Sequence, residues 1–113
     1  MTLLERAYEA LIGAGVDARL ATLHEGKCGA PYCVVYEGGT EPLGRTLCRR
    51  HILADALVPA STPEALPGLA AQIAAALQGG AELTPAGVSS TAALENYAAV
   101  TQTLDYTALC GME

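Results

Sequence analysis

The chain has 113 residues and a formal net charge of −6 at pH 7, and 51% of its residues are hydrophobic but only 4% aromatic. This length fits a single domain, residues 1–113, with a core of its own. The negative charge argues against a surface that binds nucleic acid, which needs Lys and Arg to neutralise phosphates. No apolar run approaches the roughly 20 residues that span a bilayer, so we expect no membrane partner.

The first predicted element is a helix over residues 2–13. Thr2 and Glu5 have the spacing of a capping box, and an apolar stripe follows. The stripe consists of Leu4, Tyr8, Leu11 and Ile12. The same stretch has acidic residues and lacks the basic start and uninterrupted apolar run of a signal peptide. We therefore expect a protein made in the reducing cytoplasm, with its four cysteines as free thiols.

The next stretches predict a strand and then a hairpin. Residues 16–23 alternate in polarity, which is typical of a half-buried strand. Residues 32–36, YCVVY, have strong strand composition, and residues 46–58 read as a second long strand. Between them, EGGTEPLGR at 37–45 contains three Gly and one Pro and predicts a long loop.

The last part of the chain predicts one more helix and one more strand. Residues 61–78 carry a helical apolar stripe, and Pro67 either distorts the first turn or begins the regular helix. Residues 81–93 look irregular, and residues 97–109 alternate as a strand. The order of elements predicts an α+β, two-layer fold. We expect a mostly antiparallel sheet of about four strands, with two helices on one face.

The cysteines raise the question of a zinc site. The candidate ligands are Cys28, Cys33, Cys48 and His51. Zinc needs ligands that converge on one tetrahedron, but residues three apart on a strand, such as Cys48 and His51, point to opposite faces. We favour Cys33 and Cys48 as small core residues on paired strands, with no metal. A small Cys/His metal-binding module remains an alternative.

Other motifs for chemistry are weak. The glycine pairs lack the lysine and hydroxyl residue of a phosphate-binding loop, and no serine has the context of a nucleophile elbow. His24 and Glu25 lie in a predicted turn. We therefore expect no enzyme, no catalytic residue and no cofactor.

The second strand of the hairpin is apolar on both faces, and one face must lie outside the domain's own core. We expect that mixed face to be covered by another copy of the chain. Its residues are Leu47, Arg49, His51, Leu53, Asp55 and Leu57.

The layout resembles the tail-terminator and tail-completion proteins of long-tailed bacteriophages. The resemblance covers nearly the whole chain and consists of an opening helix, a strand with a glycine-rich exit, a strand running into a capped helix, and a late strand. The stretches that carry it are LLERAYEALIGAGVDARL, APYCVVYEGG, RRHILADALVPASTPEALPGLAAQIAAALQG and YAAVTQTLDYTAL.

This resemblance implies a structural virion protein without catalytic residues. Such proteins form a ring, typically of six subunits, that caps the tail tube and joins the head-side connector, with DNA passing through the lumen. The expected location is the neck of the virion, after synthesis in the host cytoplasm. Another neck component, such as a head-closure or adaptor protein, is an alternative. In such a ring, the predicted loop is the segment that we expect to reach a neighbour or the tube. It consists of Glu37, Gly38, Gly39, Thr40, Glu41, Pro42, Leu43, Gly44 and Arg45.

Overall fold

A computed structural model describes residues 2–20, 29–94 and 98–111. It shows a mixed α+β fold with a mostly antiparallel sheet, which confirms the predicted class. The elements are α1 (Leu3–Gly13), β1 (Ala18–Arg19), β2 (Tyr32–Pro42), β3 (Leu47–Pro59), the 3-10 turn η1 (Pro63–Ala65), α2 (Leu66–Ala75), the π-helical turn η2 (Ala76–Gly80), β4 (Thr84–Val88), β5 (Ala92–Leu94) and β6 (Ala99–Gly111). No helix within the described ranges is long and apolar enough to cross a membrane.

The strands are arranged in the order β1-β2-β3-β6-β4, and β5 also pairs with β6. Among the described strands, only the short β1–β2 pair is parallel. The described residues thus form six strands, not the four predicted. Of the two additional strands, β4 lies within residues 81–93, which were predicted to be irregular, and β5 begins there and ends at Leu94. The sequence does not indicate these strands, because they contain small residues and Pro85. An exposed edge strand is held mainly by backbone pairing with its neighbour, so its residue types give little signal.

The first helix begins where the sequence predicts, and the second begins several residues after its predicted start at residue 61. Thr2 Oγ1 accepts a hydrogen bond from the Glu5 amide at 3.1 Å, and the predicted capping box is present. The regular part of α2 begins at Leu66 with Pro67 in its first turn, which agrees with one of the two readings of that proline. Ile12 departs from the prediction, since its side chain is 47% exposed rather than part of the core.

The hairpin of β2 and β3 is longer than predicted, and the loop prediction is wrong. Residues 37–42 belong to β2, and only residues 43–46 connect the two strands. A bulge lies between Glu37 and Gly39, where the register with β3 shifts. The glycines that suggested a loop serve this bulge. Gly39 has a φ of 119°, and a Cβ on Gly38 would lie 2.9 Å from Leu53 Cδ1.

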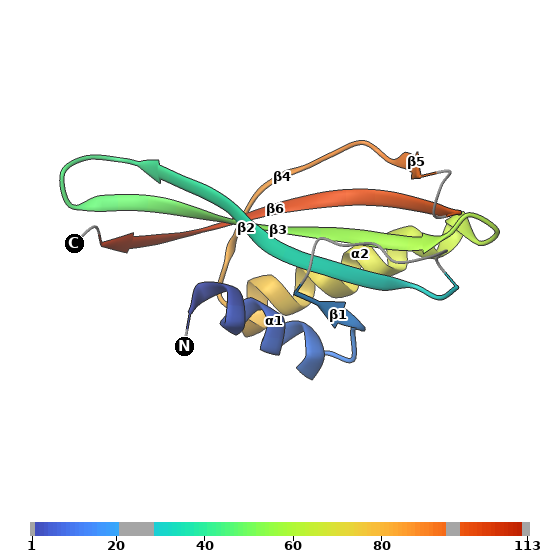
Figure 1. Cartoon of the computed structure of the whole chain (residues 1–113). Helices are drawn as coiled ribbons and strands as arrows, with labels where there is room; N and C mark the ends of the chain where they lie inside the picture. Colours follow the sequence, from blue (N-terminus) through green and yellow to red (C-terminus); the bar gives the residue numbers. More distant parts are fainter. Residues whose placement is uncertain (1, 21–28, 95–97, 112–113) are drawn as a thin grey trace.

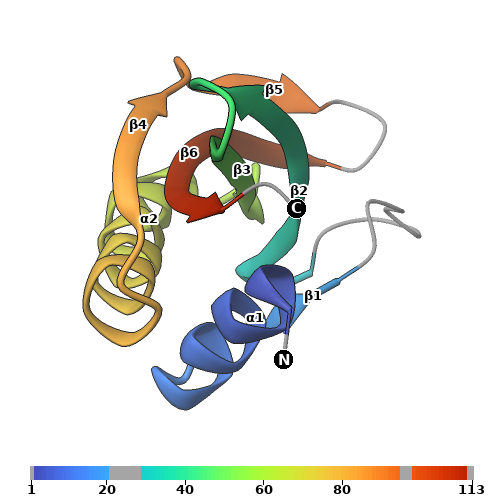
Figure 2. The same cartoon turned by 90° about the vertical axis from the view of Figure 1, so that its left-hand side faces the viewer.

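The main core lies between the helices and one face of the sheet, as the alternation of β3 and β6 predicts. In Figure 2 both helices lie below the strongly curved sheet. Side chains from α1, α2 and the facing strands meet there. Fully buried examples are Ala7, Leu11, Cys33, Val35, Ile52, Ala54 and Ile73.

A second, smaller cluster lies on the opposite face of the sheet. It consists of Tyr32, Val34, Leu57 and Ala99, with Tyr36 and Leu94 packed against it. Leu57 is 0% exposed. The prediction that Leu57 faces outward for a partner is therefore wrong, because β2, β5 and β6 of its own chain cover it.

The far end of the sheet extends beyond the helices (Figure 1). We call this part the arm: residues 36–42 of β2, residues 43–51, and residues 107–111 of β6. Every residue from 37 to 47 is exposed, and the molecule measures 48 × 25 × 21 Å. The arm therefore lacks the covering helical layer that stabilises the rest of the sheet.

Replacing Leu57 with Ala tests the second cluster. We expect a loss of about 2–5 kcal/mol in the free energy of unfolding, because the change leaves a cavity in a fully buried site. The matched control is Leu109→Ala on the same face, where the leucine is 63% exposed and the loss should stay within about 0.5 kcal/mol. Urea unfolding measures both values, and equal values for the two variants would contradict the assignment.

Candidate functional site

A polar network links the three central strands on the face opposite the helices. The Tyr36 hydroxyl donates a hydrogen bond to Asp55 Oδ1 at 3.1 Å, and the Thr103 hydroxyl donates to the same oxygen at 2.7 Å. These residues come from β2, β3 and β6, so one carboxylate connects three strands. Burial and the negative charge of Asp55 raise the pKa of Tyr36 to about 12, which keeps its hydroxyl a donor.

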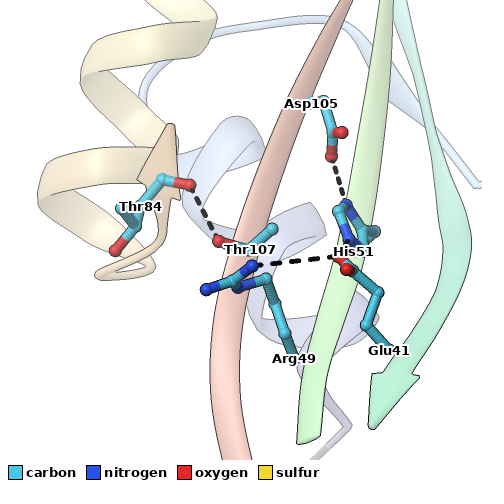
Figure 3. Close-up of polar contacts among 6 residues, drawn as sticks. All are labelled: Glu41, Arg49, His51, Thr84, Asp105 and Thr107. Atoms are coloured by element: carbon cyan, nitrogen blue, oxygen red, sulfur yellow. Dashed lines mark hydrogen bonds and ion pairs between the residues drawn. The ribbon is translucent and has the colours of Figure 1, made fainter. Parts of the chain in front are cut away.

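A second network lies further out on the same face, within and beside the arm (Figure 3). His51 of β3 contacts Asp105 of β6 through Nδ1, at 2.9 Å from Oδ1. Its other ring nitrogen, Nε2, contacts Glu41 of β2. Arg49 Nη1 lies 4.0 Å from the same Glu41 carboxylate. The imidazole therefore lies between two carboxylates that come from the two neighbouring strands.

These contacts change the protonation of the histidine and of one carboxylate. The hydrogen bond to Asp105 is the main cause that raises the pKa of His51 above its ordinary value. The hydrogen bond to Glu41 is the second cause. The hydrogen bond from His51 lowers the pKa of Glu41, and the positive charges of His51 and Arg49 act in the same direction. Both changes favour the charged forms, so the network is most complete with a protonated imidazole.

A cavity of about 380 Å³ opens beside this network, between the arm and β4. Its lining consists of Glu41, Arg49, His51, Thr84, Pro85, Ala86, Asp105 and Thr107. Thr107 donates a long hydrogen bond of 3.4 Å to the Thr84 carbonyl across one wall. Acidic and basic side chains balance in this lining, and both His51 nitrogens are already bonded. The arrangement therefore holds strands together and leaves no imidazole nitrogen available as a general base.

The proposed zinc ligands do not converge. Cys33 pairs with Ala56, whereas Cys48 pairs with Pro42, eight residues away along β3. At about 3.3 Å per residue these positions are about 26 Å apart. His51 also contacts groups on the face opposite the core cluster that contains Cys33. Cys28 lies outside the described residues. Cys33, Cys48 and His51 cannot bind one ion in this fold, and no other cluster of metal ligands occurs in the part described.

The face predicted to meet a partner is mostly used within the chain itself. His51 and Asp55 bond to neighbouring strands, and Leu53 packs over Gly38. Leu47 remains 41% exposed at the base of the arm's turn, and Arg49 is half-buried. Of the predicted interface residues, Leu47 is thus the exposed hydrophobic one.

The structure adds a residue that the sequence analysis missed. Leu109 of β6 pairs with Arg49 and is 63% exposed, and it is a diagonal neighbour of Leu47 on the same face. The alternation of residues 97–109, continued from Asp105 and Thr107, already placed Leu109 on this side of the strand. What the sequence does not show is that β6 lies beside β3 along its entire length.

No known protein-family model matches this chain, and no curated protein matches it in sequence. The interpretation of the site therefore depends on the geometry of the two networks and of the arm. That geometry places bonded polar residues in the middle of the exposed face and exposed leucines at its end.

The buried thiol of Cys33 provides a direct test of the cysteine assignment. Burial, with a further contribution from the charge of Asp55, raises the pKa of Cys33 to about 12. We expect iodoacetamide at pH 8 to leave Cys33 unmodified in the folded protein, because the reactive thiolate is scarce and inaccessible. Peptide mass spectrometry measures the modification, and the same reaction in concentrated guanidinium chloride is the control. Rapid labelling of Cys33 in the folded chain would contradict its place in the core.

Proposed function

We propose that this chain is a structural subunit of the bacteriophage tail-terminator or tail-completion type. In this proposal, copies form a closed ring, typically of six, between the tail tube and the head-side connector. The ring belongs to the neck of the virion and is made in the host cytoplasm. The subunit acts through its surfaces, without catalysis or a cofactor.

The arm is the observation that carries this proposal. A strand ribbon without a covering helical layer is only marginally stable in water, and three large hydrophobic side chains on this ribbon are exposed. They are Leu43, Leu47 and Leu109, at 42%, 41% and 63%. An exposed group of apolar side chains is typical of an interaction surface. A neighbouring subunit that covers the arm would stabilise it and bury these leucines.

The two edges of the arm differ in a way that favours a specific contact. The β2 edge carries a bulge, Pro42 and the acidic residues Glu37 and Glu41, all features that discourage another strand from pairing there. The β6 edge has no such protection. Its residues 108–111 are uncharged and, among the described residues, pair only with β3. We infer that a neighbour approaches the arm from the β6 side.

A ring requires two different surfaces on each subunit, because contacts between identical patches close a dimer instead. The arm would be one surface, and the body of the next copy would supply the other. Six copies at −6 each would give the ring a charge of about −36. A negative lumen repels phosphate, so DNA would pass through without binding specifically.

In the proposed subunit, residues 1–113 form one two-layer domain. Its basic unit would be the four strands β1, β2, β3 and β6 with both helices on one face. The short strands β4 and β5 would extend that unit at one edge. This arrangement leaves the face opposite the helices, and the arm, for contacts with neighbours and with the tube.

Replacing Leu109 with Lys tests the assembly surface. We expect the substitution to weaken self-association at least about thirtyfold, because it places a charge in the centre of the proposed contact. The matched control is Val88→Lys on β4, where the valine is 62% exposed but lies outside the arm. Native mass spectrometry and sedimentation across a range of concentrations measure the assembly, and circular dichroism checks that both variants fold.

A ring seen by electron microscopy, with a subunit number that matches the measured mass, would support the proposal. A chain that stays monomeric at all concentrations, or forms only closed dimers, would contradict it. The gene's position gives an independent check, since we expect neighbouring genes for capsid and tail proteins. A gene order that places the chain with portal and head genes alone would favour a head-closure or adaptor protein.

A further inference from the structure

We propose that His51 is a proton-dependent contact that holds the strands of the arm together. Its imidazolium form holds β2 and β6 against β3, and loss of the proton releases the end of β2. This inference concerns the folded subunit itself and does not require the ring. It predicts an arm that is ordered below a threshold pH and loosened above it.

Both contacts of His51 require a hydrogen-bond donor on the imidazole ring. Glu41 and Asp105 present carboxylate oxygens to the two ring nitrogens of His51. A carboxylate accepts hydrogen bonds, so each ring nitrogen must carry a hydrogen for both contacts to form. Only the imidazolium has two N–H groups, whereas neutral imidazole has one. The observed geometry therefore fits the protonated ring.

Deprotonation of His51 removes one of these two donors. A neutral ring keeps one N–H and directs a lone pair at the other carboxylate, which is repulsive. The Glu41 side chain is 51% exposed, compared with 32% for Asp105, so water replaces the contact with Glu41 more readily. We infer that the bond to Asp105 is kept and that the bond to β2 opens.

The pairing of β2 with β3 is weak near Glu41. The bulge at Gly38 interrupts its ladder with β3 just before the segment that bears Glu41. Beyond the bulge, residues 39–42 pair with residues 48–51, and Glu41 contacts the side chains of His51 and Arg49 there. The contact of Glu41 with His51 is therefore a large part of what holds this segment by side chains.

Other charged groups near His51 do not replace its contacts with the two carboxylates. On β3, Arg49 lies 4.0 Å from Glu41 and is the nearest further cation. Arg50 pairs with Glu37 of β2 at 3.8 Å. On β6 the facing polar groups are Asp105 and Thr107, and β4 contributes Thr84 and Pro85, which carry no charge. Since Arg49 keeps its charge across the pH range of interest, it provides a constant background rather than a switch.

The direction of the pH dependence follows from the linkage between protonation and stability. The folded state raises the pKa of His51 above its value of about 6.5 in an unfolded chain. The stabilising contribution is thus fully present below about 6.5 and is lost as pH rises through the higher, folded-state pKa. At the acidic end, the lowered pKa of Glu41 means that its contribution is lost only as pH falls through that lowered value.

The experiment is a titration of the full chain by NMR, which follows the His51 ring and the backbone amides of residues 39–41. We expect His51 to titrate above its ordinary pKa, and both Glu41→Gln and Asp105→Asn to lower that pKa. The amides of residues 39–41 should lose hydrogen-exchange protection at least about tenfold, after correction for the intrinsic pH effect, as His51 loses its proton.

Two further variants distinguish the effect of His51 protonation from general effects of pH. In His51→Gln the amide protection of residues 39–41 should no longer depend on pH, while circular dichroism should show the same fold. His24→Gln changes the only other histidine and should keep the wild-type response. A His51 pKa at or below the ordinary value would overturn the proposal. So would protection that stays constant across the His51 titration, or a pH response that disappears with His24 instead.

Discussion

The pairing of β3 with β6 along the full length of both strands is the constraint on which the rest of the structure depends. The ladder runs without a register shift from Leu47 with Gly111 to Pro59 with Ala99. It places Asp105 beside His51 and Thr103 beside Asp55, although these residues are about fifty positions apart in the chain. Because side chains alternate between faces, a slip of one residue would move both networks into the core and expose the core residues.

The two faces of this ladder are stabilised in different ways. On the helical face, apolar side chains pack against α1 and α2 and exclude water. On the opposite face, a small apolar cluster around Leu57 gives way to the Asp55 network and then to the His51 network. Hydrophobic stabilisation thus ends where the helices end, and hydrogen bonds between charged and polar groups continue outward. This change from apolar packing to hydrogen bonding along the sheet explains how an arm can extend from a chain of only 113 residues.

The same change from apolar packing to polar contacts connects the stability of the fold with the proposed function. A surface used in assembly has to remain accessible, so the helices cannot cover it. Cross-strand polar contacts hold the arm's shape in water, while in the proposed assembly Leu47 and Leu109 would provide apolar area for a neighbouring molecule. A histidine between two carboxylates makes that shape sensitive to protons, because its two contacts need the charged ring. The proposed assembly and the proposed proton-dependent order of the arm are thus separate properties that share one structural element.

The sequence by itself determined the α+β class, both helices, the hairpin and the faces of β3 and β6, because these follow from local periodicity and from residues such as Thr2 and Pro67. It also assigned Cys33 and Cys48 correctly to the core. Only the tertiary structure decided that residues 37–42 continue β2 and that Leu57 is buried, since a bulge and the covering strands depend on pairing partners distant in sequence. The His51 network belongs to this second group, because alternation shows which face a side chain occupies but register decides which residue it meets.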